Sequence, residues 1–103
     1  MALSAYAQGY YRTPAKQREY ALRHKYGLEP GDFEHMLDLQ GYRCAVCQTD
    51  EPGGRHGRFV VDHDHETGEV RGLLCSHCNV SLGWVEKVGA RSITGYLNRK
   101  KAV

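Results

Sequence analysis

The residues best suited to chemistry are four cysteines in two CxxC pairs, with an acidic, histidine-rich run between them. The pairs are Cys44 with Cys47 and Cys75 with Cys78, and the run is Asp62-His63-Asp64-His65. Four thiolates complete a closed tetrahedral zinc site, which leaves no open position on the zinc for a reaction. The carboxylates and imidazoles of the insert are then available for a second, catalytic metal.

The double CxxC pairing favours zinc over a disulfide or a redox-active pair. The pairs are separated by residues 48–74, which is longer than the commonest zinc-ribbon spacing and indicates that the insert houses something else. A structural zinc contributes directly to folding, so we expect the metal-free protein to be largely unfolded.

The run between the pairs has the residue types that phosphodiester hydrolysis needs. His63 has a pKa range suited to activating water, and Asp62 offers a hard oxygen ligand for Mg²⁺. Asn79, directly after the last cysteine, offers a second oxygen to the same cation, and His65 is a candidate to contact the scissile phosphate. An isolated run of this kind is as consistent with a solvated turn or an adventitious metal site as it is with a catalytic site. Its position between two cysteine pairs is what favours a nuclease.

A chain of 103 residues predicts one small domain of the α+β class, in which zinc staples a small core with flanking helices. We divide it into an N-terminal arm (1–13), a helical lead-in (14–41) and a zinc-bound core with a C-terminal helix (42–103). Helices are predicted over 14–26, from the turn at 28–31 to about residue 40, and from about 76–78 onward. Strands are predicted over 58–62 and 70–74. A last short helix, capped by Ser92, is expected to bury Ile93, Tyr96 and Leu97.

The net charge is only +2, but basic residues concentrate on both sides of an acidic segment at 29–52. Taken alone, these basic residues are explained by solvated helix faces. Beside a metal site, the same basic segments suit a polyanionic partner such as DNA. Candidate phosphate contacts are the basic N-terminal helix and Arg55, Arg58 and Arg71. We expect no membrane segment, because no apolar run is long enough.

One stretch carries a family resemblance. The motifs YRCAVC and VVDHDHETGEVRGLLCSHCNVSLG, within residues 42–83, closely resemble the phage recombination endonuclease VII family of His-Me finger (HNH, ββα-metal) nucleases. The preceding KYGLEPGDFEHMLDLQG is similar to the helical lead-in of many members, so the likeness covers roughly residues 25–85.

The resemblance implies a zinc-stapled ββα-metal core and a DNA endonuclease that leaves 5′-phosphate and 3′-hydroxyl ends. It implies that His63 is the general base, that Asp62 and Asn79 bind catalytic Mg²⁺ or Mn²⁺, and that His65 assists. The four cysteines would hold structural Zn²⁺. It also suggests a phage or prophage protein working on duplex or branched DNA in the bacterial cytoplasm.

The chain departs from the junction-resolving members in two ways. It has Leu82 where they carry an acidic residue one helical turn after the asparagine, and it ends at Val103, without their long C-terminal dimerisation region. These differences bear on four-way junction resolution and not on nicking. A monomer would make nicks, whereas a homodimer, or two copies on one duplex, would make double-strand breaks.

Two other functions are consistent with the sequence. One is a zinc-stabilised module that binds DNA or a protein without cutting it, since fold does not guarantee activity. The presence of Asp62, His63 and Asn79 together argues against a pure scaffold. The other is a toxin-like or restriction nuclease of the HNH type, which shares the chemistry and differs in biological role.

Overall fold

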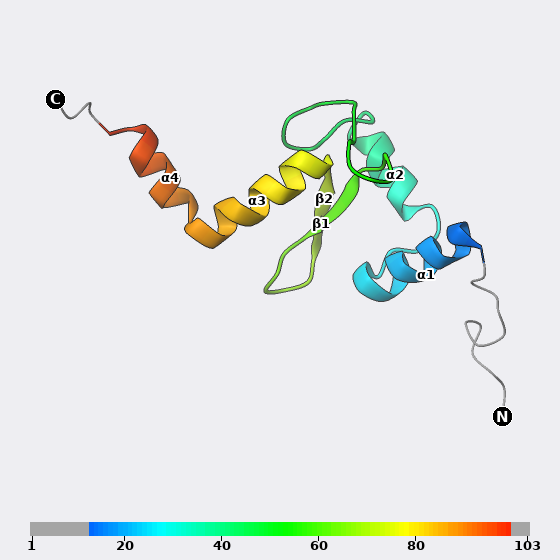
Figure 1. The fold of residues 1–103 in the computed structure, drawn as a ribbon. Helices are drawn as coiled ribbons and strands as arrows, with labels where there is room; N and C mark the ends of the chain where they lie inside the picture. The colour runs from blue at the N-terminus through cyan, green and yellow to red at the C-terminus, as the bar shows by residue number, and fades with distance from the viewer. Residues whose placement is uncertain (1–12, 100–103) are drawn as a thin grey trace. The chain divides into compact units, whose positions relative to one another are not determined.

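The computed structural model describes residues 13–99 and places in them four helices and a two-stranded sheet, in the order α1, α2, β1, β2, α3, α4 (Figure 1). This confirms a small α+β protein. The part of the N-terminal arm at 1–12 lies outside the described residues. The division into 1–13, 14–41 and 42–103 within one domain stays a prediction.

The described residues fall into two compact units. The first contains residues 13–42 and 63–72, and the second contains 43–62 and 73–99. Both strands cross from one unit to the other, because the boundaries fall after residue 62 in β1 and after residue 72 in β2.

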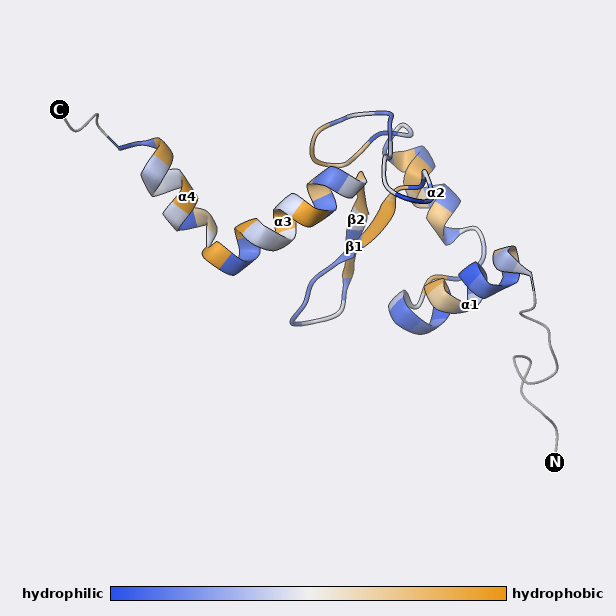
Figure 2. Ribbon diagram, viewed as in Figure 1, coloured by the Kyte–Doolittle hydropathy of each residue, from blue (hydrophilic) through white to orange (hydrophobic). Residues whose placement is uncertain are grey.

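Helix α1, Pro14–Tyr26, has the predicted bounds because both of its ends carry local signals. The Thr13 hydroxyl accepts a hydrogen bond from the backbone N–H of Lys16 at 3.2 Å, and Pro14 occupies the first helical position. At the other end Gly27 adopts the left-handed conformation, with φ of 69°, which a residue with a side chain adopts at a cost. Most of α1 is hydrophilic (Figure 2).

Helix α2, Asp32–Leu39, follows the predicted turn and buries Phe33. The Arg18 guanidinium of α1 lies over the Phe33 ring, 4.3 Å from its centroid, within the first unit. The two helices therefore contact each other through a basic side chain of α1 and an aromatic ring of α2.

Strands β1, Val60–His63, and β2, Val70–Leu74, pair with each other. Only six residues connect them, so they form an antiparallel hairpin. The prediction for β2 is confirmed, whereas the prediction that β1 covers 58–62 is wrong by up to two residues at the start and one at the end. The turn at 64–69 sets the register, so pairing extends to His63 and leaves Phe59 buried outside the strand.

The core of the second unit is small and rich in cysteine. Its buried side chains are Cys44, Phe59, Val61, Leu73, Leu74, Cys75 and Cys78. Three of these seven are cysteines, so a large share of the interior is the cysteine cluster itself.

Helices α3, Ser76–Val88, and α4, Ala90–Leu97, meet at Gly89, whose φ of 98° ends one helix and begins the next. The prediction that Ser92 caps the last helix is wrong, because Ser92 lies inside α4. The predicted burial of Tyr96 and Leu97 is also wrong: they are 68% and 74% exposed, while Ile93 is half-buried. Amphipathic spacing predicts a face, but not the partner that would cover it.

Within residues 13–99, no helix is both long and apolar enough to cross a membrane.

Candidate metal centre and catalytic hairpin

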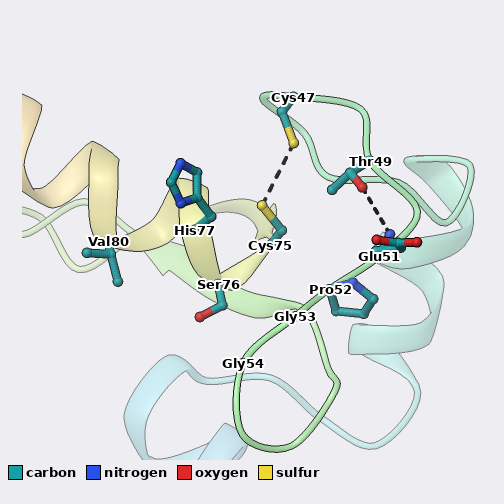
Figure 3. Close-up of a pocket in the computed structure, with 10 residues that line it drawn as sticks. All are labelled: Cys47, Thr49, Glu51, Pro52, Gly53, Gly54, Cys75, Ser76, His77 and Val80. Atoms are coloured by element: carbon teal, nitrogen blue, oxygen red, sulfur yellow. Dashed lines mark hydrogen bonds between the residues drawn. The ribbon is translucent and has the colours of Figure 1, made fainter.

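All four cysteines come together in the second unit, as the sequence predicts. Their sulfur atoms lie within 4.8 Å of one another. Among the histidine, cysteine and acidic side chains of the described residues, these four cysteines form the group whose spacing suits a metal ion. The sulfurs of Cys47 and Cys75 are 3.8 Å apart and point toward each other (Figure 3).

Each cysteine pair is shaped by backbone hydrogen bonds to sulfur. In the first pair the N–H of Val46 donates to Cys44 Sγ at 3.4 Å. In the second pair the N–H of Cys78 donates to Cys75 Sγ at 3.3 Å, where Cys75 is the N-cap of α3. Such N–H donors stabilise negative sulfur, so both turns are built to present thiolates.

Two backbone bonds join the pieces that carry the pairs. Ala45, between the first two cysteines, donates its N–H to the carbonyl of Leu73 at 3.1 Å, and Ser76 donates to the carbonyl of Pro52 at 2.8 Å. The cysteine turn, the end of β2 and the start of α3 are thereby held in one assembly within the second unit.

The sulfur spacing fits a metal and does not fit disulfides. Four ligands at a Zn–S distance of about 2.3 Å in a tetrahedron place their sulfurs about 3.8 Å apart. The Cys47–Cys75 separation of 3.8 Å matches this distance, whereas a disulfide needs about 2.05 Å. All four cysteines are free thiols in the structure.

The electrostatics of the cluster also favour a cation. At Cys44, desolvation by burial raises the pKa, but the backbone hydrogen bonds of Cys47, Cys75 and Val46 outweigh it and lower the pKa to about 6. At Cys78, burial and then the neighbouring thiols raise the pKa to about 12. One sulfur therefore ionises easily and suppresses ionisation of another. A bound cation would remove that conflict and allow all four thiolates to form.

The cluster is not equally buried on all sides. Cys47 is exposed, whereas the other three cysteines are buried. An open cavity of about 590 Å³ lies beside Cys47 and Cys75, and its wall also includes Glu51, Ser76 and His77 (Figure 3). His77 is not part of the metal-binding group among the described residues.

The predicted catalytic residues of the run lie at the end of β1. His63 is the last residue of the strand and is half-buried, and His65 is exposed two residues later. The imidazole centroids of His63 and His65 are 4.9 Å apart with the rings tilted by 57°. The structure therefore brings the predicted base and its predicted assistant into ring contact within the first unit.

A third ring joins them that the sequence analysis missed. Tyr26, the last residue of α1, places its ring centroid 5.5 Å from that of His63, tilted by 51°. The two residues are far apart in the chain, so no local pattern could have indicated the contact.

Asp62 and Asn79 both belong to the second unit and are half-buried. Asn79 lies in the first turn of α3, where its N–H donates to the carbonyl of Cys75 at 3.0 Å. The same cysteine that caps the helix therefore fixes the backbone of Asn79.

Asp64 shapes the hairpin turn. Its carboxylate Oδ1 accepts the N–H groups of Glu66 at 2.8 Å and Thr67 at 3.0 Å, and its own N–H donates to the carbonyl of Glu69 at 2.7 Å. These bonds form an Asx-type turn. The bonds from Thr67 and Glu66 lower the pKa of Asp64 below its usual range, with a smaller contribution from the charge of Arg71.

We therefore expect Asp64→Ala to lower the melting temperature, whereas Asp64→Asn keeps a carbonyl acceptor and is milder. Because the folded pKa is depressed, the carboxylate's contribution is present above its unfolded pKa of about 3.9 and is lost as the pH falls through the lower folded value. Thermal melts at pH 7 and pH 3 measure this difference. If the alanine variant melts like wild type at pH 7, the turn does not depend on the carboxylate.

The predicted phosphate contacts remain accessible in part. Arg55, Arg58 and Arg71 are exposed. In α1, by contrast, the ammonium of Lys16 lies 3.4 Å from Glu19 and the guanidinium of Arg23 lies 2.9 Å from Glu29. Such surface ion pairs are weak, so a phosphate can replace the glutamate as partner of the basic side chain. The glutamates nevertheless reduce the net positive charge around the helix.

Comparison with known proteins gives two kinds of match. The chain is 47% identical over 60 residues to the Gene 59 proteins of Mycobacterium phage L5 and Mycobacterium phage D29. The matched segment is 57% of this chain and 35% of each relative, so the chain spans about a third of the length of the curated relatives it matches. No solved structure gives a significant match.

The second match is to a protein family. The sequence model of the family described as recombination endonuclease VII matches residues 19–99, which include the cysteine cluster, the histidine-rich run and Asn79. With most of its length matched, this chain belongs to the recombination endonuclease VII family.

Proposed function

We propose that the chain is a metal-dependent DNA endonuclease that nicks by hydrolysing phosphodiester bonds and leaves 5′-phosphate and 3′-hydroxyl ends. The observation that carries the proposal is the family match over residues 19–99, which takes in every residue type that the reaction needs.

The order of the elements supports a ββα-metal core of the HNH, or His-Me finger, type. The hairpin of β1 and β2 leads directly into Cys75, which caps α3. His63 stands at the end of the first strand and Asn79 in the first turn of the helix. The other helices flank this core in the sequence, and we propose that the whole is one domain.

We propose that the four cysteines hold structural Zn²⁺. The support is their sulfur spacing and the ease with which one of them ionises. With four protein ligands the zinc has no open position, so its role is to fix the start of α3, and with it Asn79.

The catalytic cation is proposed to bind Asp62 and Asn79. A carboxylate and an amide carbonyl are hard oxygen donors, which suit Mg²⁺ or Mn²⁺. When bound, such a cation neutralises charge on the phosphate and stabilises the leaving 3′ oxygen.

The chain's own residues supply the rest of the mechanism. His63, as the neutral imidazole, takes a proton from the attacking water as general base. His65, which is in ring contact with His63, would donate a hydrogen bond to a phosphate oxygen. Arg55, Arg58 and Arg71 would contact backbone phosphates, so binding to DNA should weaken with salt.

The biological setting proposed is a phage or prophage protein that acts on duplex or branched DNA in the cytoplasm of a bacterial host. Its support is the match to two mycobacteriophage proteins. A single active site per copy makes nicks, and a homodimer would make paired cuts.

The experiment that tests the proposal is nicking of supercoiled plasmid by zinc-loaded protein. We expect conversion to open circle with Mg²⁺ or Mn²⁺, and none when the divalent cation is omitted or chelated by EDTA. Zinc content is measured after each incubation, because a chelator that strips the zinc would abolish activity for a different reason.

The alternative is a zinc-stabilised binding module. Folded, zinc-replete protein that binds plasmid and branched DNA but cleaves neither would favour the module and contradict the proposed nuclease.

A further inference from the structure

His63 contacts two other rings in the first unit. Its imidazole centroid lies 5.5 Å from that of Tyr26 and 4.9 Å from that of His65. We propose that Tyr26 is a positioning residue, which holds the His63 imidazole in the orientation that it needs as general base. This inference rests on the proposed function.

The His63 ring depends on these contacts for its orientation. Among the described residues, no hydrogen bond to either ring nitrogen of His63 accompanies the two ring contacts. A catalytic histidine is usually oriented by a hydrogen bond to its second nitrogen. Here aromatic packing takes that place, because the Tyr26 and His65 rings both contact the imidazole.

Tyr26 is itself fixed by the way α1 ends. The N–H of Gly27 donates to the carbonyl of Arg23 at 2.9 Å, and the N–H of Leu28 donates to that of Leu22 at 3.1 Å. These two hydrogen bonds end the helix at Gly27, which adopts the left-handed conformation. These hydrogen bonds restrain the backbone next to Tyr26, and a tyrosine side chain has only two rotatable bonds to restrain.

The contact between Tyr26 and His63 is only partly buried. Tyr26 and His63 are both half-buried, whereas the core side chains of the second unit are almost fully buried. The His63 imidazole is in contact with the tyrosine ring and still partly accessible, which suits a base that must reach a water molecule.

The test compares three variants in the plasmid-nicking assay. For Tyr26→Ala we expect kcat to fall by about 10- to 100-fold, with KM within about threefold of wild type. A misplaced base raises the free energy of the transition state and leaves substrate binding unchanged. Tyr26→Phe keeps the ring and should restore kcat to within about threefold of wild type. Zinc content and thermal melting should match wild type in both variants.

Tyr20→Ala is the matched control. Tyr20 is also a tyrosine of α1 with its ring against a histidine, at a centroid distance of 4.0 Å from His24, but it does not contact His63 among the described residues. Tyr20→Ala also removes a tyrosine ring from α1, and it should leave kcat within about twofold of wild type.

A second readout does not depend on activity. In NMR spectra of the zinc-loaded protein, we expect nuclear Overhauser contacts between the Tyr26 and His63 rings. The His63 ring signals, identified by their loss in His63→Ala, should shift in Tyr26→Ala and remain nearly unchanged in Tyr20→Ala.

The outcomes separate the two proposals. If His63→Ala is inactive but Tyr26→Ala keeps the wild-type kcat, Tyr26 is not a positioning residue and the nuclease stands. A rise in KM at constant kcat would make Tyr26 a DNA contact and overturn the inference as well. If wild type nicks no DNA, the proposed function fails first, and positioning for catalysis fails with it.

Discussion

Replacement of His63 by alanine should reduce nicking by about 10²- to 10⁴-fold, the usual contribution of a positioned general base. His63 ends β1 directly after Asp62, a proposed ligand of the catalytic cation. Without the His63 imidazole the proposed general base is missing, although the proposed cation ligands, His65 and the phosphate contacts remain. We therefore expect kcat to collapse while DNA binding and zinc content are preserved.

The measurement is the initial rate of plasmid nicking under excess enzyme, beside a filter-binding or fluorescence assay of DNA affinity. His35→Ala is a suitable control, because His35 is an exposed histidine of α2 outside the proposed site. His65→Ala should have a smaller effect than His63→Ala, since its proposed role is to assist. Wild-type nicking by a clean preparation of His63→Ala would contradict the mechanism.

Removal of the proposed structural zinc should unfold the second unit. Cysteines make up a large share of its buried side chains, and Cys44 is 0% exposed. Burial of a large apolar side chain contributes only about 1.5–3 kcal/mol, whereas structural zinc binding is worth about 10–16 kcal/mol at neutral pH. The few apolar side chains of this core cannot replace that contribution, and without the cation the clustered thiols repel one another on ionisation.

We expect Cys44→Ser to abolish stoichiometric zinc binding and cooperative melting, and Cys47→Ser, at the exposed corner of the cluster, to weaken both. Zinc release is measured with a colorimetric chelator, and folding by far-ultraviolet circular dichroism and NMR dispersion. Ala45→Ser is the matched control, because it introduces the same side chain on the same turn at an exposed, non-ligand position. A metal-free protein that melts cooperatively at the wild-type temperature would show that zinc is not needed for the fold.

The features that the sequence predicted well are those set by short stretches of chain. The ends of α1 follow from Thr13, Pro14 and Gly27, which act on backbone groups within one turn. The cysteine cluster is similar: each CxxC pair fixes two sulfurs on one turn, and two such pairs have few ways to satisfy one metal. The Asx turn of Asp64 was not predicted, although its acceptor and donors are only two and three residues apart.

Tertiary structure decided what depends on partners distant in the chain. The ends of β1 depend on its register with β2, so the strand is displaced toward His63. Periodicity correctly predicted a final helix, but Tyr96 and Leu97 are exposed, since a pattern of apolar residues does not specify what packs against it. In the same way, the contact of Tyr26 with His63 is produced by folding alone: the sequence determined that each residue type was present, and only the packing of α1 against the hairpin end brought the rings together.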